Sequence, residues 1–319
     1  MIKILIPILF ALFPIGTLAQ DFEKGLAAAQ TGDFVTALKE WMPLANQGDA
    51  TAQVNIGIMY SNGQGVLKNN AEAVHWYRLA ADQGNADAQV NLGSMYEFGQ
   101  GVQKDYGKAE RWFRLAADQG NPRAQLHVGF MYEFGQGVLK DYAEAARWYR
   151  LSAEQGNANA QVNLGFMYEF GQGVLKDYSE AVRWYNLAAE QGYSEAQLNL
   201  GFMYKFGRGV TKDYAEAMRW YRLAADQGNP KAQISLGTMY EYGEGVLKDY
   251  SEALHWYRLA AERGFGGAQI NLSFMYNFGR GILKDYAEAV RWYRLAADQD
   301  NARAHNSDVG AGNRNFFTK

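Results

Sequence analysis

The chain contains no cysteine and no excess of either charge, with 31 Lys and Arg against 34 Asp and Glu in 319 residues. Without cysteine there is no disulfide, no thiol nucleophile and no lipid attachment through an N-terminal cysteine, so packing alone must stabilise the fold. The balanced charge gives no sign of a nucleic-acid-binding surface. Aromatic residues make up 14% of the chain and recur at fixed places, which excludes disorder for most of its length.

Long hydrophobic runs are also missing, except at the N-terminus. Lys3 precedes an apolar stretch from Ile4 to Phe13, and the small residue Ala19 is followed by polar residues. This pattern predicts a secretory signal peptide covering residues 1–19. An uncleaved membrane anchor is the alternative, but two prolines interrupt a run that is short for a span. We therefore expect an exported bacterial protein, periplasmic or secreted, with no transmembrane span after cleavage.

The dominant feature of the chain is a 36-residue period. A Gly-x-Met-Tyr motif recurs at that spacing six times, and a seventh copy, at residues 273–276, replaces the glycine with serine. A period of this length indicates a solenoid, in which each unit buries its apolar face against its neighbours. The six glycines are Gly57, Gly93, Gly129, Gly165, Gly201 and Gly237.

Each repeat reads as two helices. In residues 157–192, helix A is expected over about 158–168, a glycine-rich turn over 170–174, and helix B over about 178–191. Asp177 and Glu180 form a capping-box pattern before helix B, and Gly192 suits the left-handed position after it. One tryptophan per repeat, such as Trp184, falls on the apolar face of helix B. We interpret these tryptophans as core residues rather than as sugar-stacking platforms.

The motifs Ala-x-Ala-Gln-x-x-Leu-Gly-x-x-Tyr, Gly-x-Gly-Val-x-x-Asp and Ala-x-x-Trp-x-x-x-Ala-Ala-x-x-Gly, in that order, resemble the Sel-1-like repeat, which is similar to the tetratricopeptide repeat. The resemblance implies an all-α superhelical solenoid of about eight antiparallel helix pairs that acts as an adaptor in protein complexes. We expect a signal peptide at 1–19, an N-terminal capping helix pair at 20–48, seven repeats at 49–300, and a degenerate tail at 301–319. Residues 301–305 are expected to start a further helix A before the chain frays.

No motif in the chain points to catalysis. The repeated Gly-x-Gly elements lie between predicted helices and lack the strand and the Lys-Ser/Thr pair of a phosphate-binding loop. The four histidines lack metal-ligand spacing, and no serine precedes a lysine by three residues. The acidic residues that recur once per repeat, such as Glu133 and Glu169, are interpreted as a solvated face. We therefore expect no catalytic residues, no cofactor and no metal.

If helix A lines the concave side of the superhelix, the exposed positions of that helix should bind the partner. The middle repeats place phenylalanines beside charged residues there, a combination typical of protein-binding hot spots. The alternative is that these phenylalanines pack between adjacent A helices. The candidate partner-binding residues are Phe130, Phe166, Phe202, Phe274, Glu133, Glu169, Lys205, Asn91, Asn163 and Asn199.

These observations favour an exported scaffold that holds a protein or peptide, not an enzyme. Capture of an extended or helical peptide by apolar anchors is the expected mode. Two alternatives stay open, namely a cell-wall-active or β-lactam-interacting enzyme and an assembly factor for a membrane-associated complex. The β-lactam binding of cysteine-rich relatives is not carried over, because this chain has no cysteine.

Overall fold

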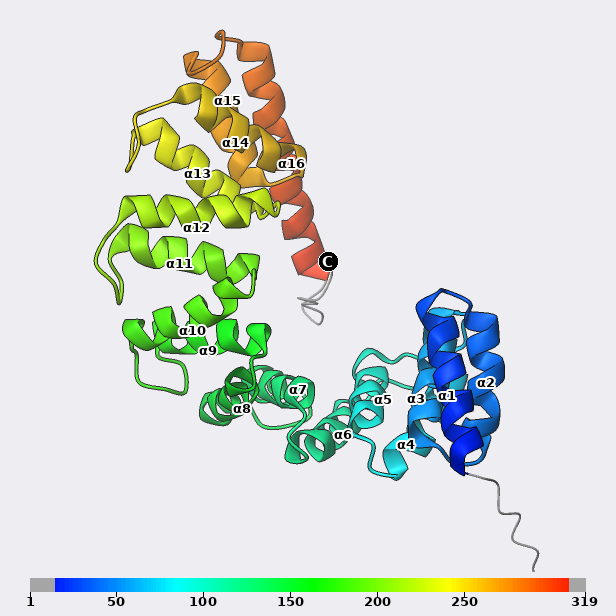
Figure 1. Ribbon diagram of the computed structural model, residues 1–319. Coiled ribbons are helices and arrows are strands. Elements are labelled where there is room, and N and C mark those ends of the chain that lie inside the picture. Colours follow the sequence, from blue (N-terminus) through cyan, green and yellow to red (C-terminus); the bar gives the residue numbers. More distant parts are fainter. Residues whose placement is uncertain (1–14, 310–319) are drawn as a thin grey trace, which may run out of the picture. The chain divides into compact units, whose positions relative to one another are not determined.

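The computed structural model describes the backbone of residues 15–309 and the side chains of residues 21–298. Within that part of the chain every regular element is an α-helix, and short loops join the helices into antiparallel pairs (Figure 1). The chain divides into an N-terminal unit, residues 1–155, and a C-terminal unit, residues 156–319. The N-terminal unit holds α1 (Ile15–Gln30), α2 (Phe34–Asn46), α3 (Ala50–Asn62), α4 (Asn70–Asp82), α5 (Ala86–Phe98), α6 (Tyr106–Asp118), α7 (Pro122–Phe134) and α8 (Tyr142–Glu154).

The C-terminal unit continues the same pattern of helix pairs. It holds α9 (Ala158–Phe170), α10 (Tyr178–Glu190), α11 (Ser194–Phe206), α12 (Tyr214–Asp226), α13 (Pro230–Tyr242), α14 (Tyr250–Glu262), α15 (Gly266–Phe278) and α16 (Tyr286–Val309). From α3 onward the odd-numbered helices are the A helices and the even-numbered ones the B helices. The expected all-α fold with a 36-residue repeat of antiparallel helix pairs is confirmed.

Asp177 caps its helix as the sequence predicts, but Glu180 pairs with Arg183, and the backbone N–H of Asp177 donates to the carbonyl oxygen of Tyr168. The side chain of Asp177 accepts hydrogen bonds from the backbone N–H groups of Ser179 and Glu180 at the start of α10. Gly171 ends α9 in the left-handed conformation, with φ of 70°, and Gly192 follows α10 with φ of 85°. Residues with a Cβ rarely adopt this conformation, so these two glycines set where each helix stops.

In every pair from α1–α2 to α13–α14, helix B packs against a glycine of helix A. A Cβ atom placed on Gly201 would lie 2.5 Å from the ring of Tyr221 in α12, and one on Gly165 would lie 2.7 Å from the ring of Tyr185. The glycine of the Gly-x-Met-Tyr motif is therefore the place where an aromatic ring lies directly on the helix A backbone. The N-terminal pair repeats the device, because a Cβ on Gly25 would collide with the indole of Trp41.

Within each unit, a buried glutamine joins one helix pair to the next. The side-chain amide of Gln125 in α7 donates to the carbonyl oxygen of Ala117 near the end of α6, at 3.3 Å. Its oxygen accepts from the side chain of Gln155, which follows α8, at 2.8 Å. The carbonyl of Ala117 lies in the last turn of a helix, where carbonyl groups have no partner within the helix. The glutamine supplies that partner and connects three successive helices.

The tryptophans of the B helices lie in the core, as predicted. Trp76, Trp148, Trp184, Trp220 and Trp256 are buried, while Trp112 and Trp292 are half-buried. Trp148 belongs to one buried cluster with Val128 of its own repeat and with Phe113 and Ala116 of the preceding repeat. Each of these indoles therefore fills space between helix pairs and is not a free platform for a ligand.

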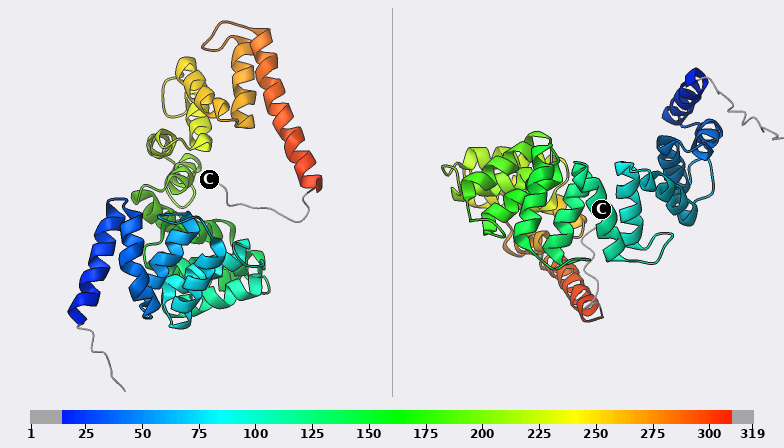
Figure 2. Two further views of the ribbon diagram at one scale, coloured as in Figure 1. Left: turned by 90° about the vertical axis from the view of Figure 1, so that its right-hand side faces the viewer. Right: turned by 90° about the horizontal axis from the view of Figure 1, so that it is seen from below.

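The two ends of the chain differ from the internal repeats. The predicted signal peptide, residues 1–19, lies outside the residues whose side chains are described, and it stays a prediction. At the other end, the expected break near residue 300 and the new helix from Asn301 are wrong, since α16 continues to Val309 (Figure 2). The reason is Asp300, which stands where glycine follows every earlier B helix. Residues 310–319 of the expected tail lie outside the described residues.

The close contact between helices A and B predicts a stability defect for Gly201→Ala. The ring of Tyr221 is buried and lies 2.5 Å from the position of the added Cβ, so we expect a loss of about 1–3 kcal/mol in the free energy of unfolding. Denaturant unfolding measures the change. The matched control is Gly107→Ala in α6, whose added Cβ meets only ordinary van der Waals contact. A Gly201→Ala protein as stable as this control would contradict the packing.

Candidate functional site

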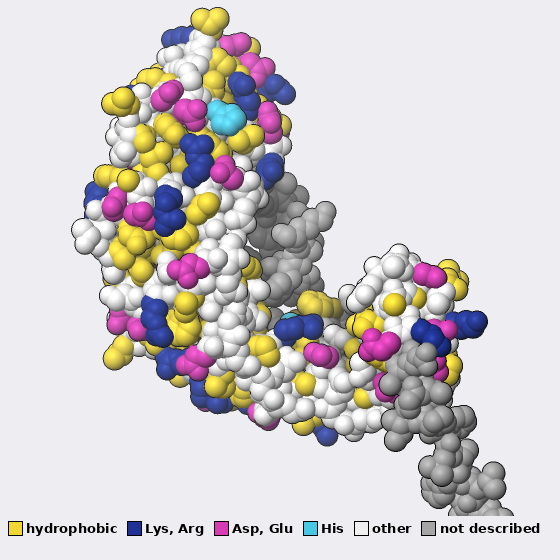
Figure 3. Space-filling model, in the orientation of Figure 1, with side chains coloured by type: hydrophobic (Ala, Val, Ile, Leu, Met, Phe, Trp, Pro, Cys, Tyr) yellow, Lys and Arg dark blue, Asp and Glu magenta, His cyan; other side chains and the backbone are white. Residues whose placement is uncertain are grey.

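The predicted phenylalanine row lies at the surface of the A helices. The side chains of Phe166, Phe202 and Phe274 are exposed, at 41%, 36% and 49%, while Phe130 is half-buried and meets the ring of Tyr149 edge-on at 5.5 Å. The rings of Phe166, Phe202 and Phe274 are therefore accessible, as expected, whereas the ring of Phe130 is partly covered. On the face visible in Figure 3, hydrophobic side chains lie among acidic and basic ones.

A second aromatic row, which the sequence reasoning missed, lies four residues further along the same helices. Phe166 and Phe170 have ring centroids 4.4 Å apart, and Phe202 and Phe206 have centroids 4.5 Å apart. Residues four apart share one helix face, so the spacing itself was the available signal. The row comprises Phe98, Phe134, Phe170, Phe206, Tyr242 and Phe278, all of them exposed.

The acidic row is not a solvated face, and that interpretation was wrong. Glu97, Glu169 and Glu241 are buried, and Glu133 is half-buried. The hydroxyl groups of Tyr185 and Tyr257 donate to Glu169 and Glu241 at 2.9 and 2.8 Å. A buried tyrosine hydroxyl needs an acceptor. The carboxylate near the end of helix A supplies that acceptor for helix B of the same repeat.

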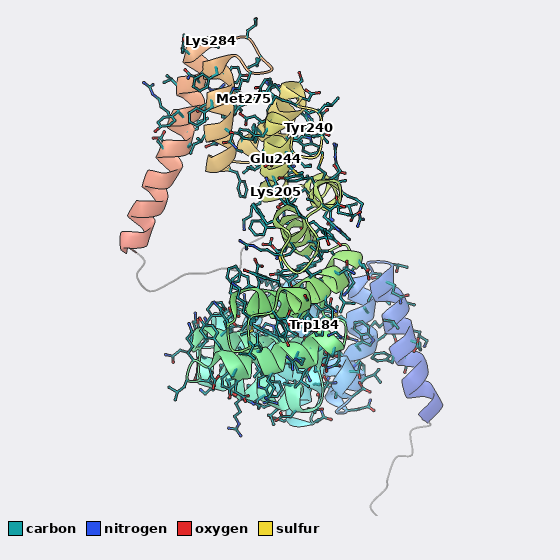
Figure 4. All side chains as sticks on the ribbon, turned by 90° about the vertical axis from the view of Figure 1, so that its left-hand side faces the viewer. Trp184, Lys205, Tyr240, Glu244, Met275 and Lys284 are labelled. Carbon is teal, nitrogen blue, oxygen red and sulfur yellow. The ribbon has the colours of Figure 1, made fainter. Side chains whose placement is uncertain are left out.

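The loop of the following repeat contributes a charged partner to this row. Arg208 and Arg280, each at the centre of a Gly-x-Gly turn, reach Glu169 and Glu241 at 3.4 and 2.7 Å. In the repeat between these two pairs the charges are exchanged. The helix position holds the basic Lys205, which pairs with the acidic Glu244 of the next loop at 2.7 Å (Figure 4). The two positions, 39 residues apart, therefore carry complementary charges across the repeat boundary.

Arg208 is held by rings as well as by charge. Its guanidinium carbon lies 4.9 Å from the ring centroid of Phe202 and 5.7 Å from that of Phe206. Arg280 lies 5.5 Å from the centroid of Phe278. A carboxylate and a pair of phenylalanines thus form a guanidinium-binding arrangement, in which cation–π attraction adds to the ion pair.

Glu97 departs from this pattern. Phe113 stands where other repeats have the tyrosine donor, and Oε2 of Glu97 is buried with no hydrogen-bond partner among the described residues. Burial raises the pKa of Glu97 to about 7, against a smaller opposing effect of Lys104. Nδ1 of His127 is 3.6 Å away, but burial, with a contribution from Arg123, lowers the pKa of His127 to about 4. The imidazole is therefore neutral at neutral pH and does not balance the carboxylate.

Two asparagines of the candidate site, Asn163 and Asn199, lie one turn before Phe166 and Phe202, whereas Asn91 lies one turn before Ser94 on α5. Asn91, Asn163 and Asn199 are all half-buried, and Nδ2 of Asn163 is buried with no acceptor among the described residues. They contribute polar groups beside the phenylalanine row. None of the three is fully exposed.

Phe274 and Asn277, at the last A helix, line a hollow of about 300 Å³ between α15 and α16. Tyr286, Val290, Tyr293 and Arg294 complete much of its lining. Tyr293 is 59% exposed, whereas its counterpart Tyr257 is buried. Ser273 replaces the glycine in this repeat, so its Cβ takes the space in which earlier rings lie on helix A.

Residues 21–298 contain no group of three His, Asp or Glu side chains that could hold a metal ion. None of the helices in the described part of the chain is both long enough and apolar enough to cross a membrane.

The comparisons with known proteins agree with this geometry. The family model described as "Sel1 repeat" matches residues 50–85, 86–121, 122–157, 158–193, 194–229, 230–265 and 267–301. The chain is a Sel1-repeat protein. Members of the Sel1-repeat family generally mediate protein–protein interactions and are typically not enzymes. None of the curated proteins shows a significant match to the chain.

Two solved structures of bacterial proteins are similar to this Sel1-repeat chain. One is c5321 of uropathogenic Escherichia coli, described as a protective antigen, with 37% identity and a TM-score of 0.80 over 94% of this chain and 67% of that one. The other is a Sel1 repeat protein from Oxalobacter formigenes, with 37% identity and a TM-score of 0.69 over 75% of this chain and 96% of that one.

The exchanged charges predict a rescue experiment. Lys205→Glu places a second carboxylate beside Glu244 and is expected to lower the free energy of unfolding by about 1–3 kcal/mol, since both side chains are partly buried. Adding Glu244→Arg recreates the Glu–Arg pair of the neighbouring repeats and should restore most of that loss. Denaturant unfolding of both single variants and the double variant forms a double-mutant cycle. Purely additive effects would show that the pair is not coupled.

Proposed function

We propose that this Sel1-repeat protein is an exported scaffold that holds a protein or peptide partner on the surface of its A helices. The observation that carries the proposal is the row of exposed phenylalanine pairs beside charged side chains, clearest at Phe166–Phe170 and Phe202–Phe206. Aromatic anchors surrounded by polar groups supply most of the binding energy in protein interfaces. The family's general role in protein–protein interaction supports the same conclusion.

Export rests on the predicted signal peptide. The similar protein from uropathogenic Escherichia coli is described as a protective antigen, and an antigen must be reachable by antibodies, which suits an exported protein. No observation favours a cell-wall-active enzyme, and an assembly factor for a membrane-associated complex would use the same A helix surface.

We expect alanine substitution of the phenylalanines to release the partner. Phe166→Ala with Phe202→Ala in the C-terminal unit, and Phe130→Ala in the N-terminal unit, remove candidate anchors, and the loss of one hot-spot residue weakens binding by about 2 kcal/mol or more. The measurement is recovery of a cross-linked partner from envelope extract, with melting curves to confirm folding. The control is Leu175→Ser with Leu247→Ser, which removes equally apolar side chains from loops where they are 91% and 92% exposed. Equal recovery by the phenylalanine variants and wild type would refute the assigned surface.

Export predicts a defined N-terminus. The protein recovered from the periplasm or medium is expected to begin at Gln20, because cleavage should follow Ala19. Leu9→Lys interrupts the apolar stretch and should leave the full-length chain in the cytoplasm. Intact-mass spectrometry of the cell fractions measures both. An exported protein that retains residues 1–19 would instead indicate an uncleaved anchor.

A further inference from the structure

We propose that the N-terminal unit contains a guanidinium-binding site, formed by Glu97 with Phe130 and Phe134, that receives an arginine side chain of the bound partner. The inference rests on the proposed function in one respect, since it places the arginine on a protein or peptide partner. It adds that the partner must present an arginine side chain.

The C-terminal unit shows what this arrangement binds. Glu169, Phe202 and Phe206 surround the guanidinium of Arg208, which comes from the chain's own loop. Glu241 and Phe278 hold Arg280 in the same manner. In both cases the carboxylate belongs to one A helix and the rings to the next. The chain therefore contains two examples of the site with an arginine in place.

The N-terminal unit has a glutamate and two phenylalanines at the corresponding positions, without the arginine. Glu97 corresponds to Glu169 in the repeat, and Phe130 and Phe134 correspond to Phe202 and Phe206. The loop position is Gln136, which carries no charge and has a shorter side chain than arginine. The acidic and aromatic residues are present here, and the loop arginine is not.

Glu97 is also the least satisfied of the buried carboxylates. It is 8% exposed, its Oε2 has no hydrogen-bond partner among the described residues, and Phe113 removes the hydroxyl donor that Glu169 and Glu241 receive. A buried carboxylate without a donor or cation is costly to ionise. A cation that binds beside Glu97 stabilises the ionised carboxylate, so the site favours a positively charged ligand.

The rings select the kind of cation. A guanidinium is planar, stacks on aromatic faces and donates to carboxylates in a fixed geometry, whereas an ammonium is a compact and strongly hydrated charge. A metal ion would need several converging ligands, and no group of three His, Asp or Glu is found in residues 21–298. Arg208 and Arg280 occupy the equivalent positions, which favours arginine over lysine.

The first test uses acetyl-arginine amide as the probe and acetyl-citrulline amide, its uncharged analogue, as the control. The NMR signals of the His127 ring report binding locally, because this imidazole lies 3.6 Å from Glu97. For the full chain we expect saturation by the arginine probe with a dissociation constant on the order of 1 mM. We expect no saturation by the citrulline probe. Glu97→Gln should weaken binding at least about tenfold, and an unchanged titration in that variant would overturn the proposal.

The affinity should also depend on pH. The charge that acts on the pKa of Glu97 is that of Lys104, in the loop after α5, whereas Arg123 on α7 acts on His127, which stays neutral above its pKa of about 4. Because the pKa of Glu97 is about 7, binding requires loss of its proton and should weaken by about tenfold from pH 8 to pH 6. Equal affinity at the two pH values would show that this carboxylate does not bind the probe.

The second test fills the site from within. Gln136→Arg gives the N-terminal unit the loop residue of Arg208 and Arg280, so it should raise the Tm by about 2–4 °C and abolish binding of the arginine probe. The matched control is Gln100→Arg in the preceding loop. The residue 39 positions earlier, which would be the partner of the new arginine, is Ser61 there and not a carboxylate, so neither the Tm nor the binding of the probe should change. A Gln136→Arg protein that binds the probe as well as wild type would overturn the proposal.

Partner recovery separates this inference from the proposed function. If Glu97→Gln and Gln136→Arg both reduce recovery of the partner as the phenylalanine variants do, the arginine of the partner occupies this site. If recovery is lost in Phe166→Ala/Phe202→Ala but unchanged in Glu97→Gln and Gln136→Arg, the scaffold function holds and the arginine site is refuted.

Discussion

The buried glutamine of helix A is the contact on which the stacking of helix pairs depends. Its amide satisfies a carbonyl group at the end of the preceding helix B, as Gln125 does for Ala117. In the repeats from Gln53 to Gln197 its oxygen also accepts from the glutamine that follows its own helix B, whereas the oxygens of Gln233 and Gln269 have no partner among the described residues. Both groups are buried, so the loss of one partner would leave an unsatisfied polar group in the core. A hydrophobic residue could fill the same volume, but it could not fix the register of one pair on the next. Seven buried glutamines, from Gln53 to Gln269, occupy this position, whereas the surface positions vary.

The fold was predictable because its determinants are local and repeated. The capping residues, the left-handed glycines and the glycine under the tyrosine ring each act within one helix pair and recur at a fixed spacing, so the sequence shows them directly. The end of the seventh repeat was not predictable in the same way. Resemblance to earlier repeats suggested a break at residue 300, but one replacement of glycine by Asp300 lets α16 continue.

The candidate site was only partly predictable, because its contacts join distant residues. The position of the phenylalanine row followed from helical spacing, but the acidic row was misread as solvated. The burial of Glu169 depends on Tyr185, 16 residues later, and on Arg208, 39 residues later. One sequence signal could have revealed the second contact. The helix and loop positions change charge together, from Glu169 and Arg208 to Lys205 and Glu244, and back to Glu241 and Arg280.

The same row of positions supports two different uses of a buried carboxylate. Where the loop supplies arginine, as at Glu241, the carboxylate stabilises the contact between consecutive repeats, and its charge is not available to a ligand. Where the loop residue is neutral, as at Gln136, Lys104 offsets only part of the cost of burying Glu97, and the pKa of Glu97 rises to about 7. Retaining such a group lowers stability, and a repeat array with many other contacts can tolerate that. One residue in a surface loop therefore decides whether the carboxylate stabilises the contact between repeats or remains available to bind a partner.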